Sequence, residues 1–456
     1  MKKDRFSLLL FFTSLILISA ISYARQYFSD YNYPPATKIV RYCALLVISI
    51  LFINYILFMN SQKKAVDFKF NYKFCIPVFL VGLYLASIYP LFSIDLYEYI
   101  IRGRMLGIYH ANPYLHFPYE YPNDLFNMIP YAKIFWQAQA MIYGPLWTIL
   151  VTIMSLIDIK SVFISLFSVK FMVYLFHLGA SFYVFKIADS LNFKNAKFIA
   201  QAYLFNPFIL LVAGVDGHLD TVMICFFVAS IAALLKNRFY LAFFLMSLSI
   251  LVKYFPVLFI PFYIFYMHSV LEKGPFFKKA LISISILLAT IAFFYMPFWS
   301  GISIFSSLKT VASMVESCSI PYIYYKLISL LVPNIPQQVF RYVCYGIFIA
   351  GYYFIFVLFL SSGDKKQRLV TSILLVFFLY ILVGAFQLNP WHLVWIIPFI
   401  VLSKLPYKFT LMSLVSFAAS IAFWKRISVL LIIVLSVYTL LIIATRKRTR
   451  ETSFPT

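Results

Sequence analysis

Residues 93–104 read Ser93-Ile-Asp-Leu-Tyr-Glu-Tyr-Ile-Ile-Arg-Gly-Arg104 and directly follow a hydrophobic segment. The surrounding sequence is almost continuously apolar, yet two acids and two arginines fall here within about three helical turns. If residues 95–106 form a helix, Asp95, Glu98 and Arg102 share one face. Charged groups at the mouth of a membrane helix are costly, which makes this stretch a candidate functional site. The alternative is an ion-paired helix cap at the water interface.

The composition identifies the class of protein. Of the 456 residues, 63% are hydrophobic and 12% are charged. No soluble globular chain hides that much apolar surface, so the sequence predicts an all-α polytopic membrane protein. We expect one integral membrane domain over residues 1–456, without an inserted soluble domain or an internal repeat of fixed period.

Apolar segments long enough to cross a bilayer set the expected number of spans at about 12–14. The first one resembles a signal peptide, but many spans follow it, so we interpret it as an uncleaved transmembrane helix. The last one is followed by a basic cytoplasmic tail, and the two occupy residues 427–456. The long segments are 6–24, 39–59, 74–92, 162–185, 280–298, 341–361, 369–386 and 427–444. Shorter or interrupted ones are 141–157, 199–214, 220–235, 239–252, 254–267, 391–404 and 408–423.

The net charge of +23 could indicate a nucleic-acid partner, but the basic residues are scattered between apolar runs. The positive-inside rule explains most of this charge, so we expect no nucleic acid. Attraction to anionic lipid, including a phosphate-bearing lipid substrate, explains some of the remainder. Placing the basic clusters in the cytoplasm leaves a second set of loops outside a cell inner (plasma) membrane. These outer loops are 93–140, 215–220, the point near Lys253, 299–340 and 387–392.

One segment does not fit this scheme. Residues 141–185 must cross the membrane an odd number of times, although they read as two helices. Either the part that begins Tyr143-Gly-Pro-Leu-Trp147 only dips into the bilayer, or the loop with Lys194 and Lys197 breaks the charge rule. The sequence leaves both alternatives open.

The first outer loop is long and rich in Tyr, Pro and Asn. We expect residues 93–140 to lie against the membrane surface as turns and short interfacial helices. Aromatic rings stack on sugar faces and carboxylates accept sugar hydroxyls, so the composition suits sugar binding. The alternative is an amphipathic cover over the helix ends.

Two acids flank a histidine in Val215-Asp-Gly-His-Leu-Asp220. Asp216, His218 and Asp220 alternate, which could direct carboxylates to sugar hydroxyls or to a counter-ion, and metal ligation is possible in principle. Capping of the following helix by either acid is the competing interpretation. Lys253, between two short apolar segments, is a cation available to a lipid phosphate.

A third cluster is Asn389-Pro-Trp-His-Leu-Val-Trp395. His392 could protonate or neutralise a phosphate oxygen, whereas a lone interfacial histidine is more often structural. The five cysteines form no CxxC pair and no disulfide framework. The sequence contains no nucleotide-binding glycine pattern and no hydrolase motif. This absence favours a sugar donor that already resides in the membrane.

Taken in order, these clusters resemble the integral membrane glycosyltransferases of the GT-C superfamily, in particular the polyprenyl-phosphate-sugar-dependent, mannosyltransferase-like bacterial branch. The resemblance covers roughly residues 75–405. Its carriers are Asp95-Leu-Tyr-Glu-Tyr with Arg102-Gly-Arg104 and Asn112-Pro-Tyr114, Tyr143-Gly-Pro-Leu146, Asn206-Pro207 with Gly217-His-Leu-Asp220, Val252-Lys-Tyr-Phe-Pro256, and Pro390-Trp-His with Trp395 and Pro398.

The resemblance implies a GT-C-like fold and an inverting transfer. Asp95 would be the catalytic general base, removing a proton from an acceptor hydroxyl that attacks the anomeric carbon. Four cationic or titratable residues would bind the donor phosphate as it departs: Arg102, Arg104, Lys253 and His392. Acceptor or sugar binding would fall on Glu98, Asn112, Tyr114, Asp216, His218 and Asp220. No metal and no other cofactor is expected.

Two departures from the branch concern acceptor specificity and the role of His218: Leu219 stands where an amide is common, and Gly144 where a second proline is common. The sequence therefore predicts transfer of a hexose, mannose being the first expectation, to a lipid-linked or polysaccharide acceptor on the extracytoplasmic side. The alternatives are a lipid-oligosaccharide flippase or transporter, which would place charges midway through several spans, and a polysaccharide ligase or polymerase, which would place arginines and a histidine in a large late outer loop.

Overall fold

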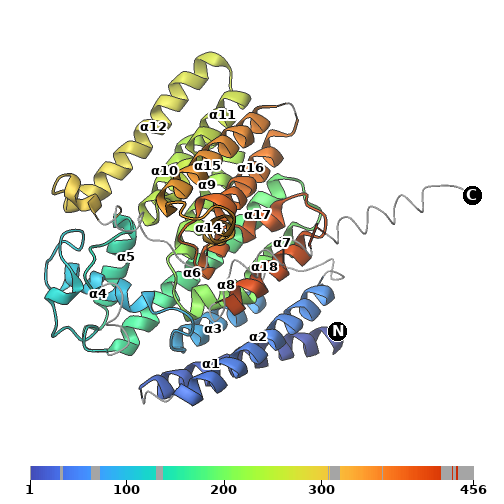
Figure 1. The fold of residues 1–456 in the computed structure, drawn as a ribbon. Coiled ribbons are helices and arrows are strands. Elements are labelled where there is room, and N and C mark those ends of the chain that lie inside the picture. The colour runs from blue at the N-terminus through green and yellow to red at the C-terminus, as the bar shows by residue number, and fades with distance from the viewer. Residues whose placement is uncertain are drawn as a thin grey trace, which may run out of the picture. The chain divides into compact units, whose positions relative to one another are not determined.

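The computed structural model describes residues 2–30, 34–62, 72–129, 137–306, 308, 319–361, 363–422, 434 and 438–439. Within these ranges the chain forms 17 α-helices and no strand (Figure 1), which confirms the all-α prediction. Several predicted features lie wholly or largely outside the described residues: the span 427–444 with the basic tail, the basic cluster at Lys63-Lys64 and Lys69, residues 130–136 of the first outer loop, and Lys309 with Glu316 in the fourth.

Among the described residues, five helices are long and apolar enough to cross a membrane, which supports a polytopic membrane protein. A sixth span is present if a pair bent by 47° is counted as one. Nine further apolar helices have 10–17 residues. The five include all or most of α2 (Pro34–Gln62), α6 (Val162–Ser190), α12 (Lys273–Tyr295), α15 (Gln337–Leu360) and α16 (Lys365–Leu379), and the spans that contain α12 and α16 continue to Phe298 and Gly384. The bent pair is α7 (Ala196–Leu204) with α8 (Pro207–Leu210) and the π-helical turn Leu211–Val215.

The chain divides into two compact units, of which the second comprises residues 315–363 and 370–456. Its described helices include α14 (Ile320–Leu331), α15, most of α16, α17 (Ile397–Leu402) and α18 (Lys408–Ala422). Phe340, Cys344 and Phe386 form a buried cluster in this unit. His392 lies in a short 3-10 helix, Pro390–Trp395.

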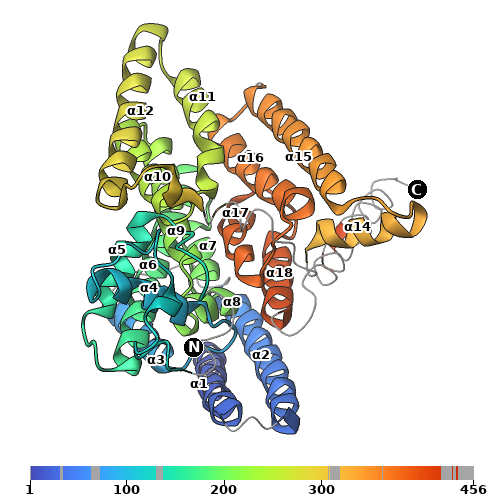
Figure 2. The ribbon, with the colours of Figure 1, turned by 60° about the vertical axis from the view of Figure 1, so that its left-hand side comes forward.

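The first unit comprises residues 1–314 and 364–369 and contains the other candidate site residues. Helices α1 (Lys2–Asp30) and α2 lie side by side as a pair (Figures 1 and 2). Helix α6 packs against α3 (Tyr72–Ser87) and α9 (Asp220–Leu235), and α9 packs against α10 (Phe239–Val252). Helix α11 (Ile260–Val270) leads into α12.

Helix α4 (Asp95–Gly107) matches the helix predicted over residues 95–106. Asp95 and Glu98 occupy its first turn and Arg104 its last, where each charge complements the helix dipole. The helix lies against α5 (Pro145–Ser155), as Figure 2 shows. A Cβ on Gly103 would lie 2.9 Å from the backbone nitrogen of Thr152, so the glycine allows the two backbones to approach closely.

The length of α5 bears on the orientation of the chain. Its 11 residues span about 16 Å, whereas the hydrocarbon core of a bilayer is about 30 Å thick. This length agrees with the alternative in which the segment beginning at Tyr143 only dips into the bilayer.

Candidate active site

The site is built on one face of α4. The guanidinium of Arg102 forms an ion pair with the carboxylate of Glu98, and its Nε donates to Oε1 at 2.7 Å. The Arg102 side chain is 1% exposed and that of Glu98 is 11% exposed. Burial raises the pKa of Glu98 to about 7; the Arg102 charge opposes this rise and the Asp95 charge adds to it. The three residues therefore interact along the face predicted from their spacing.

Tyr99, one turn after Asp95, lies at the centre of the site. Its hydroxyl is 3.3 Å from Nδ1 of His218. Its ring packs edge-to-face on Tyr143 and Trp147, with centroid separations of 5.5 and 5.2 Å. One tyrosine thus joins α4 to the turn before α5 and to the turn before α9.

The negative charge of Asp95 acts on the hydroxyl groups of both Tyr99 and Tyr143. The pKa of Tyr99 lies well above its usual value, mainly because of burial, and Tyr143 and the charges on Asp95 and Asp220 raise it further. The pKa of Tyr143 is also raised, by burial first and then by Asp95, Glu98 and Asp220. Two carboxylates from distant parts of the chain therefore lie near this pair of phenols.

Lys253 supplies a cation beside Tyr143. Its Nζ lies 2.8 Å from Oδ1 of Asp220 and 5.8 Å from the centroid of the Tyr143 ring. The Asp220 side chain is 1% exposed, whereas that of Lys253 is 17% exposed. Nδ1 of His218 is 4.0 Å from Oδ2 of Asp220. Because burial lowers the pKa of His218 to about 3, its imidazole is neutral at neutral pH.

Gly144 brings Tyr143 and Lys253 together. Its N–H donates to the carbonyl of Val252 at 3.2 Å. A Cβ at this position would lie 2.0 Å from the carbonyl oxygen of Leu251, so no other residue fits without moving the backbone. The glycine therefore places the Tyr143 turn directly against the end of α10.

Asp216 contacts the backbone of the segment just before α4. Its Oδ1 accepts hydrogen bonds from the N–H groups of Leu91 and Phe92, at 2.8 and 3.1 Å. The ammonium of Lys170, on α6, donates to the carbonyl of Ile88 and is 1% exposed. Both side chains hold the segment that leads into Asp95.

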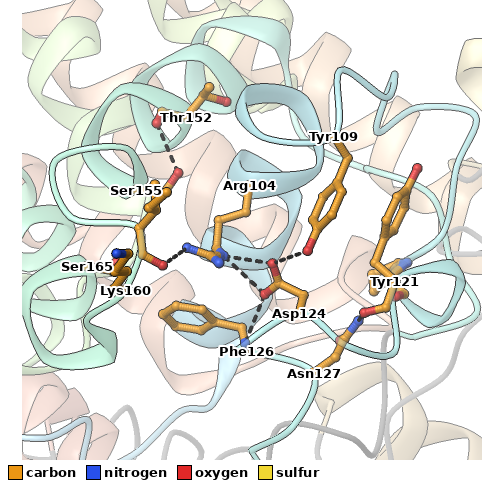
Figure 3. A network of polar contacts seen from close by, with 12 residues as sticks. Arg104, Tyr109, Tyr121, Asp124, Phe126, Asn127, Thr152, Ser155, Lys160 and Ser165 are labelled. Carbon is orange, nitrogen blue, oxygen red and sulfur yellow. Dashed lines mark hydrogen bonds and ion pairs between the residues drawn. The ribbon is translucent and has the colours of Figure 1, made fainter.

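Arg104 contacts the first outer loop through Asp124, beside Tyr109 and Phe126 (Figure 3). Its Nε lies 2.9 and 3.0 Å from the two carboxylate oxygens of Asp124, and Nη1 donates to the carbonyl of Ile159 at 2.9 Å. The Tyr109 hydroxyl donates to the same carboxylate at 3.0 Å. The guanidinium also lies over the Phe126 ring, 5.5 Å from its centroid. These contacts link the loop to α4.

The family model described as alpha-(1->6)-mannopyranosyltransferase, N-terminal domain, matches residues 16–269, which is more than half of the chain. The chain belongs to the MptA_B family. This mannosyltransferase family agrees with the GT-C resemblance. No curated protein matches the chain.

The part matched by the MptA_B family contains every site segment from Asp95 to Lys253. His392 lies beyond it and in the second unit. The N–H of Asn389 donates to Nδ1 of His392 at 3.1 Å, and the imidazole ring is 4.8 Å from the Trp395 ring. Its contact with a donor phosphate stays a prediction.

Asn112 and Tyr114 support the site from the first outer loop. The Tyr114 hydroxyl donates to the carbonyl of Tyr143 at 2.8 Å. The Asn112 amide donates to the carbonyl of Phe298 at 2.9 Å, and its Oδ1 accepts from the Tyr114 N–H at 3.1 Å. After α4, the described residues of this loop form one short helix, Pro118–Glu120.

Three of the five predicted outer loops therefore meet in the first unit of this family member. They bring Asp95, Glu98 and Arg102 to His218, Asp220 and Lys253. Three residues of the site were not predicted from the sequence: Tyr99, Tyr143 and Lys170. Tyr99 could have been predicted from its spacing, because it lies four residues after Asp95 and residues four apart share a helix face. Among the described residues no three His, Cys, Asp or Glu side chains are grouped to hold a metal ion.

Proposed function

We propose that the chain transfers mannose from a polyprenyl-phosphate donor to a lipid-linked or polysaccharide acceptor, on the extracytoplasmic side of the inner membrane and with inversion at the anomeric carbon. The supporting observation is the surroundings of Tyr143. The ammonium of Lys253 lies over its ring, and the Asp95 charge acts on its phenol. An acid and a cation beside one aromatic ring suit a sugar attacked from one side and departing from the other.

Asp95 is the general base in this proposal. It removes the proton from an acceptor hydroxyl while the hydroxyl oxygen forms a bond to the anomeric carbon. The bond between that carbon and the donor phosphate oxygen breaks, and the lipid phosphate leaves with the electron pair. Lys253 and Arg102 stabilise the negative charge that develops on the departing phosphate. No second catalytic acid is required, because a phosphate leaves without protonation.

The remaining residues divide into two groups in this proposal. Tyr143, which is partly exposed, provides aromatic surface for a sugar ring, and the buried rings of Tyr99 and Trp147 hold it in place. Glu98, His218 and Asp220 provide groups for the sugar hydroxyls. The other predicted ligands position the site through their contacts with the chain: Arg104 through Asp124, Asp216 through the segment before α4, and Asn112 and Tyr114 through the Tyr143 turn.

The proposal is tested with Asp95→Asn in the full-length protein. Transfer from radiolabelled polyprenyl-phosphate mannose is measured in membranes and, after purification, by kcat and KM. We expect kcat to fall by about 10²–10⁴, the usual contribution of a general base. Asp189→Asn, at an exposed position near the end of α6, is the matched control and keeps full activity. Near-normal turnover of a folded Asp95→Asn protein would falsify the base assignment.

The donor class is tested separately. The wild-type protein is offered radiolabelled polyprenyl-phosphate mannose or nucleotide-linked mannose, and the product is analysed for its anomeric configuration. We expect transfer from the lipid-linked donor alone, with inversion. Transfer from the nucleotide sugar, or retention, contradicts the proposal. Movement of lipid-linked sugar across proteoliposomes without transfer supports the flippase alternative instead.

A further inference from the structure

A cavity of about 240 Å³ lies between α6, α9 and α10, away from the candidate active site. Helix α9 begins at Asp220, in the active site, and ends at Leu235, beside Lys236 of the cavity wall. Its 16 residues span about 24 Å. The cavity is therefore a separate feature at the other end of the same helices.

Three cations line this cavity: Lys186, Lys236 and Arg238. Lys186 belongs to the last turns of α6, and its Nζ lies 5.1 Å from the centroid of the Phe182 ring. Among the residues that the structure describes, none of the three cations forms an ion pair with an acid. Their charges are thus available to an anion from outside the chain.

The turn between α9 and α10 places two of these cations together. Lys236 and Arg238 flank Asn237, whose φ of 57° lies in the left-handed region that asparagine tolerates better than most residues. The N–H groups of Asn237 and Arg238 donate to the carbonyls of Leu234 and Ala233, which fixes the turn. Both charged side chains therefore start from one tight, hydrogen-bonded turn.

The wall between the cations is apolar. Ala229 and Ala232 of α9 contribute only methyl groups, which leave space between the helices, and Leu241 of α10 is exposed beside them. A hydrocarbon chain is stabilised by burial against such a surface, whereas a small soluble anion is not. Three unneutralised cations next to an apolar groove fit an amphiphile with a negatively charged head.

We propose that this cavity binds an anionic phospholipid, with its phosphate between Lys186, Lys236 and Arg238 and an acyl chain along α9 and α10. Basic residues at helix ends attract anionic lipid in general. The cavity turns this general attraction into a site, because it gathers the three charges around one concave surface.

The test measures lipid retention by the purified, delipidated full-length protein. Native mass spectrometry follows the titration with phosphatidylglycerol and, in parallel, with phosphatidylcholine. We expect Lys186→Gln/Lys236→Gln/Arg238→Gln to weaken the tightest phosphatidylglycerol binding by roughly fivefold for each charge removed. Phosphatidylcholine binding is expected to stay unchanged.

A matched control removes the same charge elsewhere. Lys194→Gln/Lys197→Gln/Lys278→Gln changes three exposed lysines outside the cavity and is expected to retain wild-type binding. A charge-preserving variant, Lys186→Arg/Lys236→Arg, should also retain it. If the cavity triple does not fold, Lys236→Gln alone, on the exposed turn, provides the same comparison with a smaller effect.

Three results overturn the proposal. If the triple variant of the cavity and the triple control variant weaken phosphatidylglycerol binding equally, the lipid responds to the overall positive charge of the protein and not to this cavity. Unchanged binding in the folded cavity triple excludes the three cations. Displacement of the lipid by inorganic phosphate at similar concentration shows that a free anion, not a lipid, is the ligand. Active-site variants such as Asp95→Asn should leave lipid binding unchanged, which separates this test from that of the proposed function.

Discussion

The ammonium of Lys253 lies 2.8 Å from the carboxylate of Asp220, although 33 positions separate them in the chain. The contact joins the end of α10 to the start of α9. Because the Asp220 side chain is almost completely buried, removal of the lysine leaves a buried carboxylate without this cation. The ion pair thus stabilises the fold at the place where we propose that Lys253 stabilises a departing phosphate.

The first prediction concerns this pair. Lys253→Met should lower the free energy of unfolding by about 3–5 kcal/mol, the usual effect of breaking a buried ion pair. Lys253→Met/Asp220→Asn should recover much of that stability but none of the transfer activity. Chemical unfolding in detergent and the transfer assay measure the two effects, with Lys197→Met as an exposed control. Restored activity in the double variant argues against a role for Lys253 at the donor phosphate.

The second prediction concerns Arg104 and Asp124. Asp124→Asn should weaken the anchoring of the loop, lower the free energy of unfolding by about 2–4 kcal/mol, and raise KM for the acceptor more than it lowers kcat. Arg104→Lys should show a milder form of the same effects, because lysine lacks the planar fork with which Arg104 contacts Asp124 and the Ile159 carbonyl together. Limited proteolysis of the loop and the split between KM and kcat provide the measurement.

The same variants also test the role that the sequence predicts for Arg104. If Arg104→Lys weakens the binding of the polyprenyl-phosphate donor while loop proteolysis stays at the wild-type rate, Arg104 acts on the phosphate and not through Asp124.

The third prediction concerns Gly144. A Cβ there would lie 2.0 Å from the Leu251 carbonyl oxygen, so Gly144→Ala must separate the Tyr143 turn from α10. We expect destabilisation of about 1–3 kcal/mol and a large loss of transfer. Gly346→Ala, in α15, is the matched control, because no atom lies within 4 Å of its added Cβ. The control should be neutral or stabilising by about 1 kcal/mol. If Gly144→Ala and Gly346→Ala change the thermal unfolding temperature equally, the Tyr143 turn does not lie directly against α10.

The fourth prediction concerns the pH dependence of stability. Burial raises the pKa of Glu98 from 4.5 to about 7, so the folded state holds this proton more tightly than the unfolded state. Its contribution to stability is therefore complete below pH 4.5 and is lost as the pH rises to about 7. Glu98→Gln cannot ionise, and its thermal unfolding should vary less with pH over this window. The control Glu272→Gln, exposed at the start of α12, should show the same pH dependence of thermal unfolding as the wild type. If the wild type, Glu98→Gln and Glu272→Gln all show the same pH dependence, Glu98 does not have a raised pKa in the folded state.

The helices of this fold could be predicted well because each apolar run is bounded by polar or helix-breaking residues. The segments 220–235 and 239–252 coincide with α9 and α10, and the charged stretch at 95–106 with α4. Which segments cross the membrane was harder to predict, since hydrophobicity alone does not distinguish a short packed helix from a span. The 11-residue α5 is the clearest example.

The site could be predicted only in part, because its partners are distant in the chain. Local spacing was sufficient for the Glu98–Arg102 pair, whose members are four residues apart. No local pattern could pair Asp216 with the backbone of Leu91, which is 125 positions away. The position of Tyr99 between two loops depends equally on how α4, α5 and α9 pack.

The contacts of the first outer loop have a consequence for acceptor recognition. Asp124 binds Arg104 and Tyr109, and the Asn127 amide donates to two carbonyls of the same loop, those of Pro118 and Tyr121. These bonds are made within the described part of the loop, so under the proposed function that part loses little conformational entropy when a glycan binds. A preorganised surface of this kind would give more of its interaction energy to affinity, and it would discriminate between glycans by shape without first folding around them.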